Sequence, residues 1–177
     1  MSNRGFTILE TIVALGVISL AIAGVFSAVR TGLVASINSK DEIRAFYLVQ
    51  EAIEVLRQKR DNNKLTSINS GIAVNWLTGI ANVASDPCFP GKTCMVNGYT
   101  NTISVCSEGW NSCPVLRQNA SSYLYGYDGA WTATKYKREI QIEKNGANEV
   151  VITISVRWSK RVNNYEFKVK TLLLNWR

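Results

Sequence analysis

Histidine is absent from the 177 residues of the chain. Without an imidazole, the chain lacks the commonest general base, the Ser-His and Cys-His nucleophile pairs, and the most frequent ligands of zinc and iron. Catalysis would have to rest on carboxylates or lysines. The composition therefore argues against an enzyme, and we expect neither a cofactor nor a metal.

Proline is absent before Pro87, and formal charge is absent from residues 11–29. This uncharged stretch extends back to Phe6, with Glu10 as its one interruption. As a helix, residues 6–29 span about 36 Å, which is enough to cross the apolar core of a bilayer. We therefore expect a membrane helix. A carboxylate in such a helix is costly unless it is paired, so Glu10 is a candidate functional residue.

The segment RGFTILE at residues 4–10, followed by an apolar run, resembles the processing signal of type IV prepilins and pseudopilins. In that family a membrane peptidase cuts after the glycine and methylates the new amino terminus. The resemblance places this cut between Gly5 and Phe6. Glu10 then has the position of the family's filament-assembly glutamate.

The resemblance implies a structural subunit, either a minor pilin of the V type or a type II secretion pseudopilin of the I type. Its partners would be other pilin subunits through the N-terminal helix, the prepilin peptidase, membrane lipid and an inner-membrane assembly platform. The subunit would cross the cytoplasmic membrane once, with its C-terminal part outside the cytoplasm, and then enter a pilus or a secretion filament.

The charges near the amino terminus fit this role. The amine of a mature Phe6 is positive and Glu10 is negative, so pairing between adjacent subunits would offset part of the cost of desolvation in a helix bundle. One alternative is that Glu10 only complements the positive end of its own helix. Another is an ordinary signal peptide, cut after Ala23 and before Gly24.

Beyond Arg30 the apolar residues move to one side of the expected helix. They recur at spacings of three and four, the pattern of an amphipathic helix. The stripe consists of Ile43, Phe46, Val49, Ile53 and Leu56, with Ala45, Leu48 and Ala52 beside it. We expect residues 30–62 to continue the membrane helix, which ends near the polar triplet at residues 61–63.

Residues 63–134 are rich in Asn, Ser, Gly and Thr, and the resemblance assigns them to the variable region of pilins. They contain the four cysteines Cys88, Cys94, Cys106 and Cys113. Since a segment beyond the membrane helix would face an oxidising compartment, we expect disulfides. Three pairings are open. We favour Cys88–Cys94 with Cys106–Cys113, which close small loops, over a metal site built from all four thiolates.

Four aromatic residues follow the cysteines at short spacings: Tyr123, Tyr125, Tyr127 and Trp131. Such residues could line a carbohydrate or peptide site. The alternative is that they pack a loop over a sheet, with their polar groups turned to partners.

Residues 135–177 contain three stretches that alternate apolar and polar residues, as β-strands do. They begin near Tyr136, Val150 and Tyr165, and an Asn-Gly pair at residues 145–146 predicts the first turn. We expect a three-stranded antiparallel meander that buries one face against the amphipathic helix. The predicted fold class is α+β and pilin-like: a long N-terminal helix on a C-terminal antiparallel sheet.

The net charge of +7 is concentrated in the last quarter of the chain, where ten basic residues stand against four acidic ones. A surface for nucleic acid, anionic lipid or an acidic subunit would use Lys135, Lys137, Arg138, Lys168 and Lys170. A solvated sheet face is the alternative. A DNA-capturing competence pilin is therefore a second functional hypothesis.

The expected organisation has five parts. They are a leader (1–5), a transmembrane or filament-core helix (6–29), an amphipathic continuation (30–62), a variable disulfide-bearing region (63–134) and an antiparallel sheet (135–177).

Overall fold

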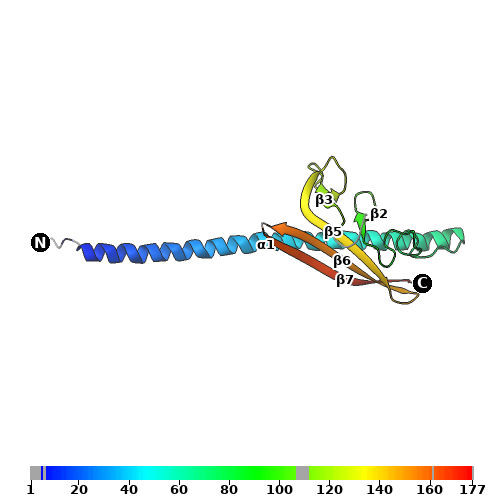
Figure 1. The fold of residues 1–177 in the computed structure, drawn as a ribbon, viewed down its shortest axis with the longest axis horizontal. Helices are drawn as coiled ribbons and strands as arrows, with labels where there is room; N and C mark the ends of the chain where they lie inside the picture. Colours follow the sequence, from blue (N-terminus) through cyan, green and yellow to red (C-terminus); the bar gives the residue numbers. More distant parts are fainter. Residues whose placement is uncertain (1–4, 6, 107–111, 161, 177) are drawn as a thin grey trace. The chain divides into compact units, whose positions relative to one another are not determined.

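The computed structural model describes residues 5, 7–106, 112–160 and 162–176. The chain divides into two units, Met1–Ile43 and Arg44–Arg177. The described part of the first unit is mostly helix. The second contains the rest of that helix and seven strands, so the fold class is α+β, as predicted (Figure 1).

Helix α1 runs from Ile8 to Ser70, well beyond the end predicted near Asp61. The polar triplet does not stop the helix because Asn63 finds partners at its side. Its Nδ2 atom donates to the carbonyl oxygens of Trp76 and Thr78, at 3.1 and 2.8 Å. The helix ends where Gly71 takes a positive φ of 68°, a conformation that glycine adopts without strain.

The seven strands form one antiparallel sheet. Four short strands lie in the region that the sequence analysis left without regular structure: β1 (Cys94–Asn97), β2 (Thr102–Val105), β3 (Val115–Gln118) and β4 (Tyr125–Gly126). Three long strands follow: β5 (Thr132–Lys144), β6 (Glu149–Lys160) and β7 (Asn163–Leu174). The predicted meander is confirmed, including the turn at residues 145–148, where Gly146 has a φ of 86°.

Strand β5 joins the two parts of the sheet. One of its edges pairs with β6 along nine residues, and the other edge meets β1 at Ile140 and β3 between Thr132 and Lys137. In Figure 1, β5 lies beside β6 and then curves away toward β3. Strand β7 pairs with β6 alone and forms an edge of the sheet.

The core of the second unit lies between α1 and one face of β5, β6 and β7. The predicted stripe is confirmed in part: Val49 and Leu56 are buried and Ile53 is partly buried, whereas Ile43 and Phe46 are exposed. The neighbouring Ala45, Leu48 and Ala52 are buried as well. Residues of the connecting loop, including Trp76 and Ile80, complete the same core.

Candidate functional site

The described N-terminal segment begins α1 with a capping arrangement that the sequence analysis did not identify. The Oγ1 atom of Thr7 accepts a hydrogen bond from the backbone N–H of Glu10 at 3.3 Å, and the carbonyl of Thr7 accepts one from Thr11. Threonine followed three residues later by glutamate is the sequence pattern of a helix capping box. Gly5 and Glu10 are exposed, and Phe6 lies outside the described residues.

The first half of α1 exposes its apolar side chains in every direction. The large ones from Ile8 to Ile37 are about half exposed or more, and no residue in the most apolar window is buried. Among the described residues, α1 is the one helix long and apolar enough to cross a membrane. A surface of this kind needs an apolar environment, either lipid or other helices.

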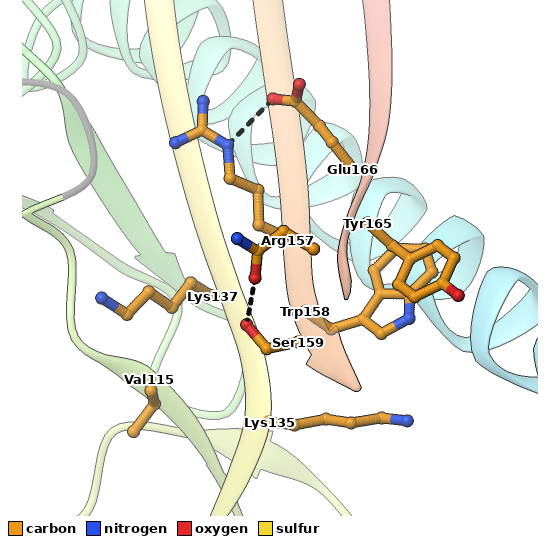
Figure 2. Close-up of a pocket in the computed structure, with 9 residues that line it drawn as sticks. Val115, Lys135, Lys137, Arg157, Trp158, Ser159, Tyr165 and Glu166 are labelled. Carbon is orange, nitrogen blue, oxygen red and sulfur yellow. Dashed lines mark hydrogen bonds and ion pairs between the residues drawn. The ribbon is translucent and has the colours of Figure 1, made fainter. Parts of the chain in front are cut away.

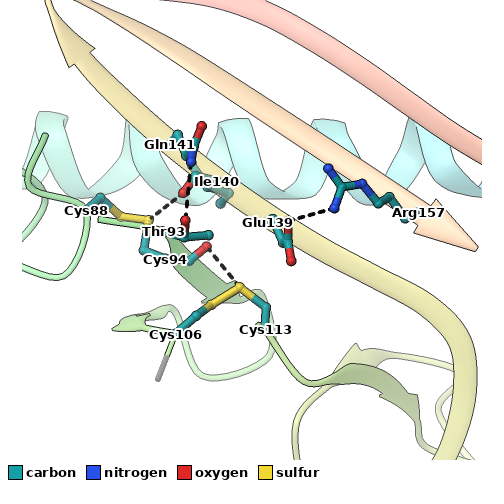
Figure 3. Close-up of a disulfide and its surroundings, with 9 residues drawn as sticks. All are labelled: Cys88, Thr93, Cys94, Cys106, Cys113, Glu139, Ile140, Gln141 and Arg157. Atoms are coloured by element: carbon teal, nitrogen blue, oxygen red, sulfur yellow. Dashed lines mark hydrogen bonds and ion pairs between the residues drawn. A yellow bond between two sulfur atoms is a disulfide. The ribbon is translucent and has the colours of Figure 1, made fainter. Parts of the chain in front are cut away.

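Both favoured disulfides are present in the structure: Cys88–Cys94 and Cys106–Cys113. They lie close together beside β1 and β5, with Sγ of Cys113 3.8 Å from the carbonyl oxygen of Cys94 (Figure 3). The first ties the loop after α1 to the start of β1. No cysteine is free, so the thiolate metal site is excluded by the structure.

Arg138 is not a surface residue, which corrects its assignment to the basic surface. Its side chain is 0% exposed and reaches from β5 to the helix. One guanidinium nitrogen lies 2.7 Å from Oε2 of Glu51 and 2.6 Å from the carbonyl oxygen of Leu48. The other donates to the carbonyl oxygen of Val96. The cation therefore joins α1, β5 and β1 inside the core.

Two neighbours show how closely this ion pair is enclosed. Gly98 lies against Glu51, and a Cβ atom on Gly98 would meet the Glu51 carboxylate at 1.8 Å. Tyr127 lies on the other side, where burial raises the pKa of its hydroxyl although the nearby Arg138 opposes this shift. We attribute the pair to the architecture of the second unit (Arg44–Arg177), which we call the head, and not to ligand binding.

Three of the other four predicted basic residues share one face of the sheet. The register places Lys137 beside Arg157, Lys168 beside Ser155 and Lys170 beside Thr153, all on the side opposite α1. Lys135 lies where the pairing of β5 with β3 is irregular, and its Nζ atom is 5.4 Å from the ring centroid of Tyr136. Carboxylates interrupt this basic face: Arg157 forms ion pairs with Glu139 at 3.4 Å and Glu166 at 3.0 Å.

A hollow of about 530 Å³ lies at the end of the basic face, lined by Lys135, Lys137 and Arg157 among others. Figure 2 shows the two lysines along β5 and the bond between Arg157 and Glu166. Partial burial alone would raise the pKa of Glu166. Hydrogen bonding to Arg157 and the charges of Arg157 and Lys168 outweigh it and lower that pKa.

The four aromatic candidates do not form one surface. Tyr127 is largely buried near Arg138, and Trp131 makes an edge contact with Tyr99, their ring centroids 5.2 Å apart. Tyr123 and Tyr125 line a separate hollow of about 280 Å³ together with Tyr47. The structure therefore divides them between packing and an open groove.

The C-terminal residues are tied to the helix in a way that the sequence pattern did not indicate. Nε1 of Trp176 donates to Oδ1 of Asp61 at 2.9 Å, and Arg60 donates to the carbonyl oxygen of Leu174 at 3.2 Å. The hydrogen bond from Arg60, with a smaller one from Trp176, lowers the pKa of Asp61 although burial opposes the shift.

The architecture is pilin-like: a long N-terminal helix with an apolar start, a C-terminal antiparallel sheet packed on its second half, and two disulfides between them. Comparisons with protein-family models, with curated proteins and with solved structures give no match for this chain.

Proposed function

We propose that the chain is a structural subunit of a filament of the type IV pilin and pseudopilin class, as a minor pilin or a pseudopilin. One observation carries the proposal. A single helix, Ile8–Ser70, exposes apolar side chains throughout its first half and packs its second half into the core of a disulfide-bearing head. One element thus supplies both an anchor and part of a folded domain, which suits a subunit assembled through its helix. The role is structural and not catalytic.

In this proposal the chain resides in the cytoplasmic membrane before assembly, with its head outside the cytoplasm, where disulfides persist. A prepilin peptidase cuts between Gly5 and Phe6 and methylates the new terminus. An assembly platform then draws the helix into the filament, where Glu10 pairs with the terminal amine of a neighbouring subunit. The exposure of Glu10 in the first turn of an apolar helix supports this assignment.

The mature amino terminus tests the proposal directly. Mass spectrometry of membrane fractions is expected to find a methylated terminus at Phe6 when the prepilin peptidase is present, and the uncut chain when it is deleted. Gly5→Ile is expected to block the cut, and Ala23→Leu to leave it unchanged. If the terminus is instead Gly24, and Ala23→Leu blocks its formation, the chain is an exported protein released by ordinary signal peptidase, and the filament proposal is wrong.

A second candidate function is DNA capture, which the shared face of Lys137, Lys168 and Lys170 favours, with Lys135 in the hollow at its end. Duplex binding by the full chain in detergent should then weaken steeply with salt, because each lysine that neutralises a phosphate releases a counterion. Changing the four lysines to glutamine should reduce both affinity and salt dependence. Binding that is absent, or insensitive to salt, rules this candidate out.

A further inference from the structure

The open edge of β7 is a strand without a neighbour on its outer side. All twelve residues of β7 pair with β6, and among the described residues no other strand pairs with it. In an edge strand every second residue points its N–H and C=O groups away from the sheet, which offers a template for another strand. Twelve residues is long for an exposed edge.

Helix α1 leaves this edge accessible. On the helix-facing side of β6, Ile152, Ile154 and Val156 are fully buried, whereas Phe167 and Val169 on β7 are only partly buried. The helix therefore covers β6 and stops short of closing the outer side of β7. Exposed apolar side chains lie at both ends of β7: Val162 (94%) in the turn before it, and Leu172 (52%) and Leu174 (50%) at its end.

The sequence of β7 is complementary to itself in one antiparallel register. We propose that β7 pairs with β7 of a second copy about a two-fold axis at Phe167, which joins the two sheets. On the face opposite α1, Glu166 of each copy then lies opposite Lys168 of the other, and Asn164 opposite Lys170. On the helix-facing side, Phe167 meets Phe167.

The neighbouring registers are worse because they oppose like charges. An axis at residue 166 places Glu166 opposite Glu166, and one at residue 168 places Lys168 opposite Lys168. An axis at residue 169 places Lys168 opposite Lys170 twice. Directly opposed like charges destabilise antiparallel pairs, whereas opposite charges and apolar pairs stabilise them. The charge pattern thus selects the register at Phe167.

The pairing has a directional consequence. Phe46 contacts Phe167, and Asp61 binds Trp176, so β7 and the second half of α1 run in the same direction. A two-fold axis between antiparallel strands makes the two helices antiparallel as well. The contact therefore joins heads of opposite orientation, such as those on two filaments lying side by side, and not neighbours in one membrane. It rests on the fold of residues 44–177 and is independent of the proposed function.

Charge reversal tests both the contact and its register. The full chain in detergent is studied by sedimentation equilibrium over a range of protein-to-detergent ratios, as wild type, Glu166→Lys, Lys168→Glu and the double variant. The wild type should dimerise, each single variant should bind itself about tenfold or more weakly, and the double variant should recover. A mixture of the two single variants should also recover, because it pairs two lysines with two glutamates.

The mixture is decisive because each single variant should dimerise only weakly by itself. Thermal melting of each variant verifies that the head is folded. A wild type that remains monomeric overturns the proposal. So does a dimer that all charge reversals leave unchanged, since it would form through the apolar helix. A mixture that fails to recover from two folded variants rejects the register at Phe167.

Discussion

At the scale of single residues, the ion pair of the buried Arg138 with the partly exposed Glu51 explains how the helix and sheet are held in one register. Arg138 interrupts the apolar side of β5, and Glu51 lies beside the buried stripe of α1, between Leu48 and Val55. Opposite charges that each interrupt an apolar face are a signal that they meet in the core. That signal was present in the sequence, but Arg138 was grouped with the basic residues of the last quarter and assigned to the surface.

Replacing Arg138 by methionine is expected to destabilise the head by about 2–4 kcal/mol, because the carbonyl oxygens of Leu48 and Val96 would lose a charged donor in the core. Lys137→Met, one residue away on the opposite face, should change stability by about 0.5 kcal/mol or less. Urea unfolding in nonionic detergent measures both by tryptophan fluorescence, because all five tryptophans lie in residues 44–177. Equal effects of the two changes would contradict the assignment.

Asp61 makes the stability of the head depend on pH in the acid range. Its folded pKa lies below the ordinary value of 3.8, so the ionised group stabilises the fold above that pH. This stabilisation is lost as the pH falls through the folded pKa. We expect the melting temperature of the wild type to fall more steeply below about pH 4 than that of Asp61→Asn. Parallel curves for the two proteins would show that the ionised Asp61 carboxylate, bonded to Arg60 and Trp176, contributes nothing measurable.

At the scale of elements, long segments with a clear periodicity were predicted, whereas short strands and contacts with residues distant in the sequence were not. Period-two alternation identified β5, β6 and β7, and an Asn-Gly pair located the turn between the first two. The four short strands have two to four residues each, too few for a period to stand out. The end of α1 was misplaced because Asn63 is stabilised by carbonyls of a distant loop, which no local pattern records.

The end of α1 provides a matched pair of asparagines for a test. Asn63→Ala removes two hydrogen bonds and leaves the carbonyls of Trp76 and Thr78 without their donor. It should destabilise the head by about 1–3 kcal/mol. Asn62→Ala, next to it and exposed, should be close to neutral. The same urea titration compares them, and a neutral Asn63→Ala would mean that other contacts hold the last turns of the helix.

The disulfide Cys88–Cys94 belongs to the same connection between α1 and β1. Replacing both cysteines by alanine opens a loop with a sequence separation of 6. The expected loss is about 2–3 kcal/mol, which depends on the model of the unfolded chain. Reductant should lower the melting temperature of this variant less than that of the wild type, because only Cys106–Cys113 then remains to be reduced. An equal response of both proteins would show that the first disulfide does not stabilise the fold.

At the scale of the whole molecule, sequence reasoning predicted the α+β class and the pairing of the cysteines. The long elements each have a pattern that a single sequence shows: an uninterrupted apolar run, apolar residues at helical spacing, and period-two alternation in the three strands. Three of the five residues predicted for the basic face share it, namely Lys137, Lys168 and Lys170. The contact of Trp176 with Asp61 and the open edge of β7 depend on tertiary neighbours, so they became visible only in the structure. The capping by Thr7 is local, and its Thr-x-x-Glu pattern was present in the sequence.

The filament proposal makes its sharpest prediction at Glu10. Glu10→Gln preserves the shape of the side chain and removes its charge, so insertion of the helix into a membrane should be unimpaired or easier. The head should melt as the wild type does, because Glu10 lies outside the unit of residues 44–177. Incorporation into filaments should be lost, because the terminal amine of the neighbouring subunit would have no counter-charge in an apolar bundle. Quantifying the chain in sheared filaments and in membranes measures this, with the exposed Glu42→Gln as the control. Normal incorporation of Glu10→Gln would show that Glu10 merely caps its own helix.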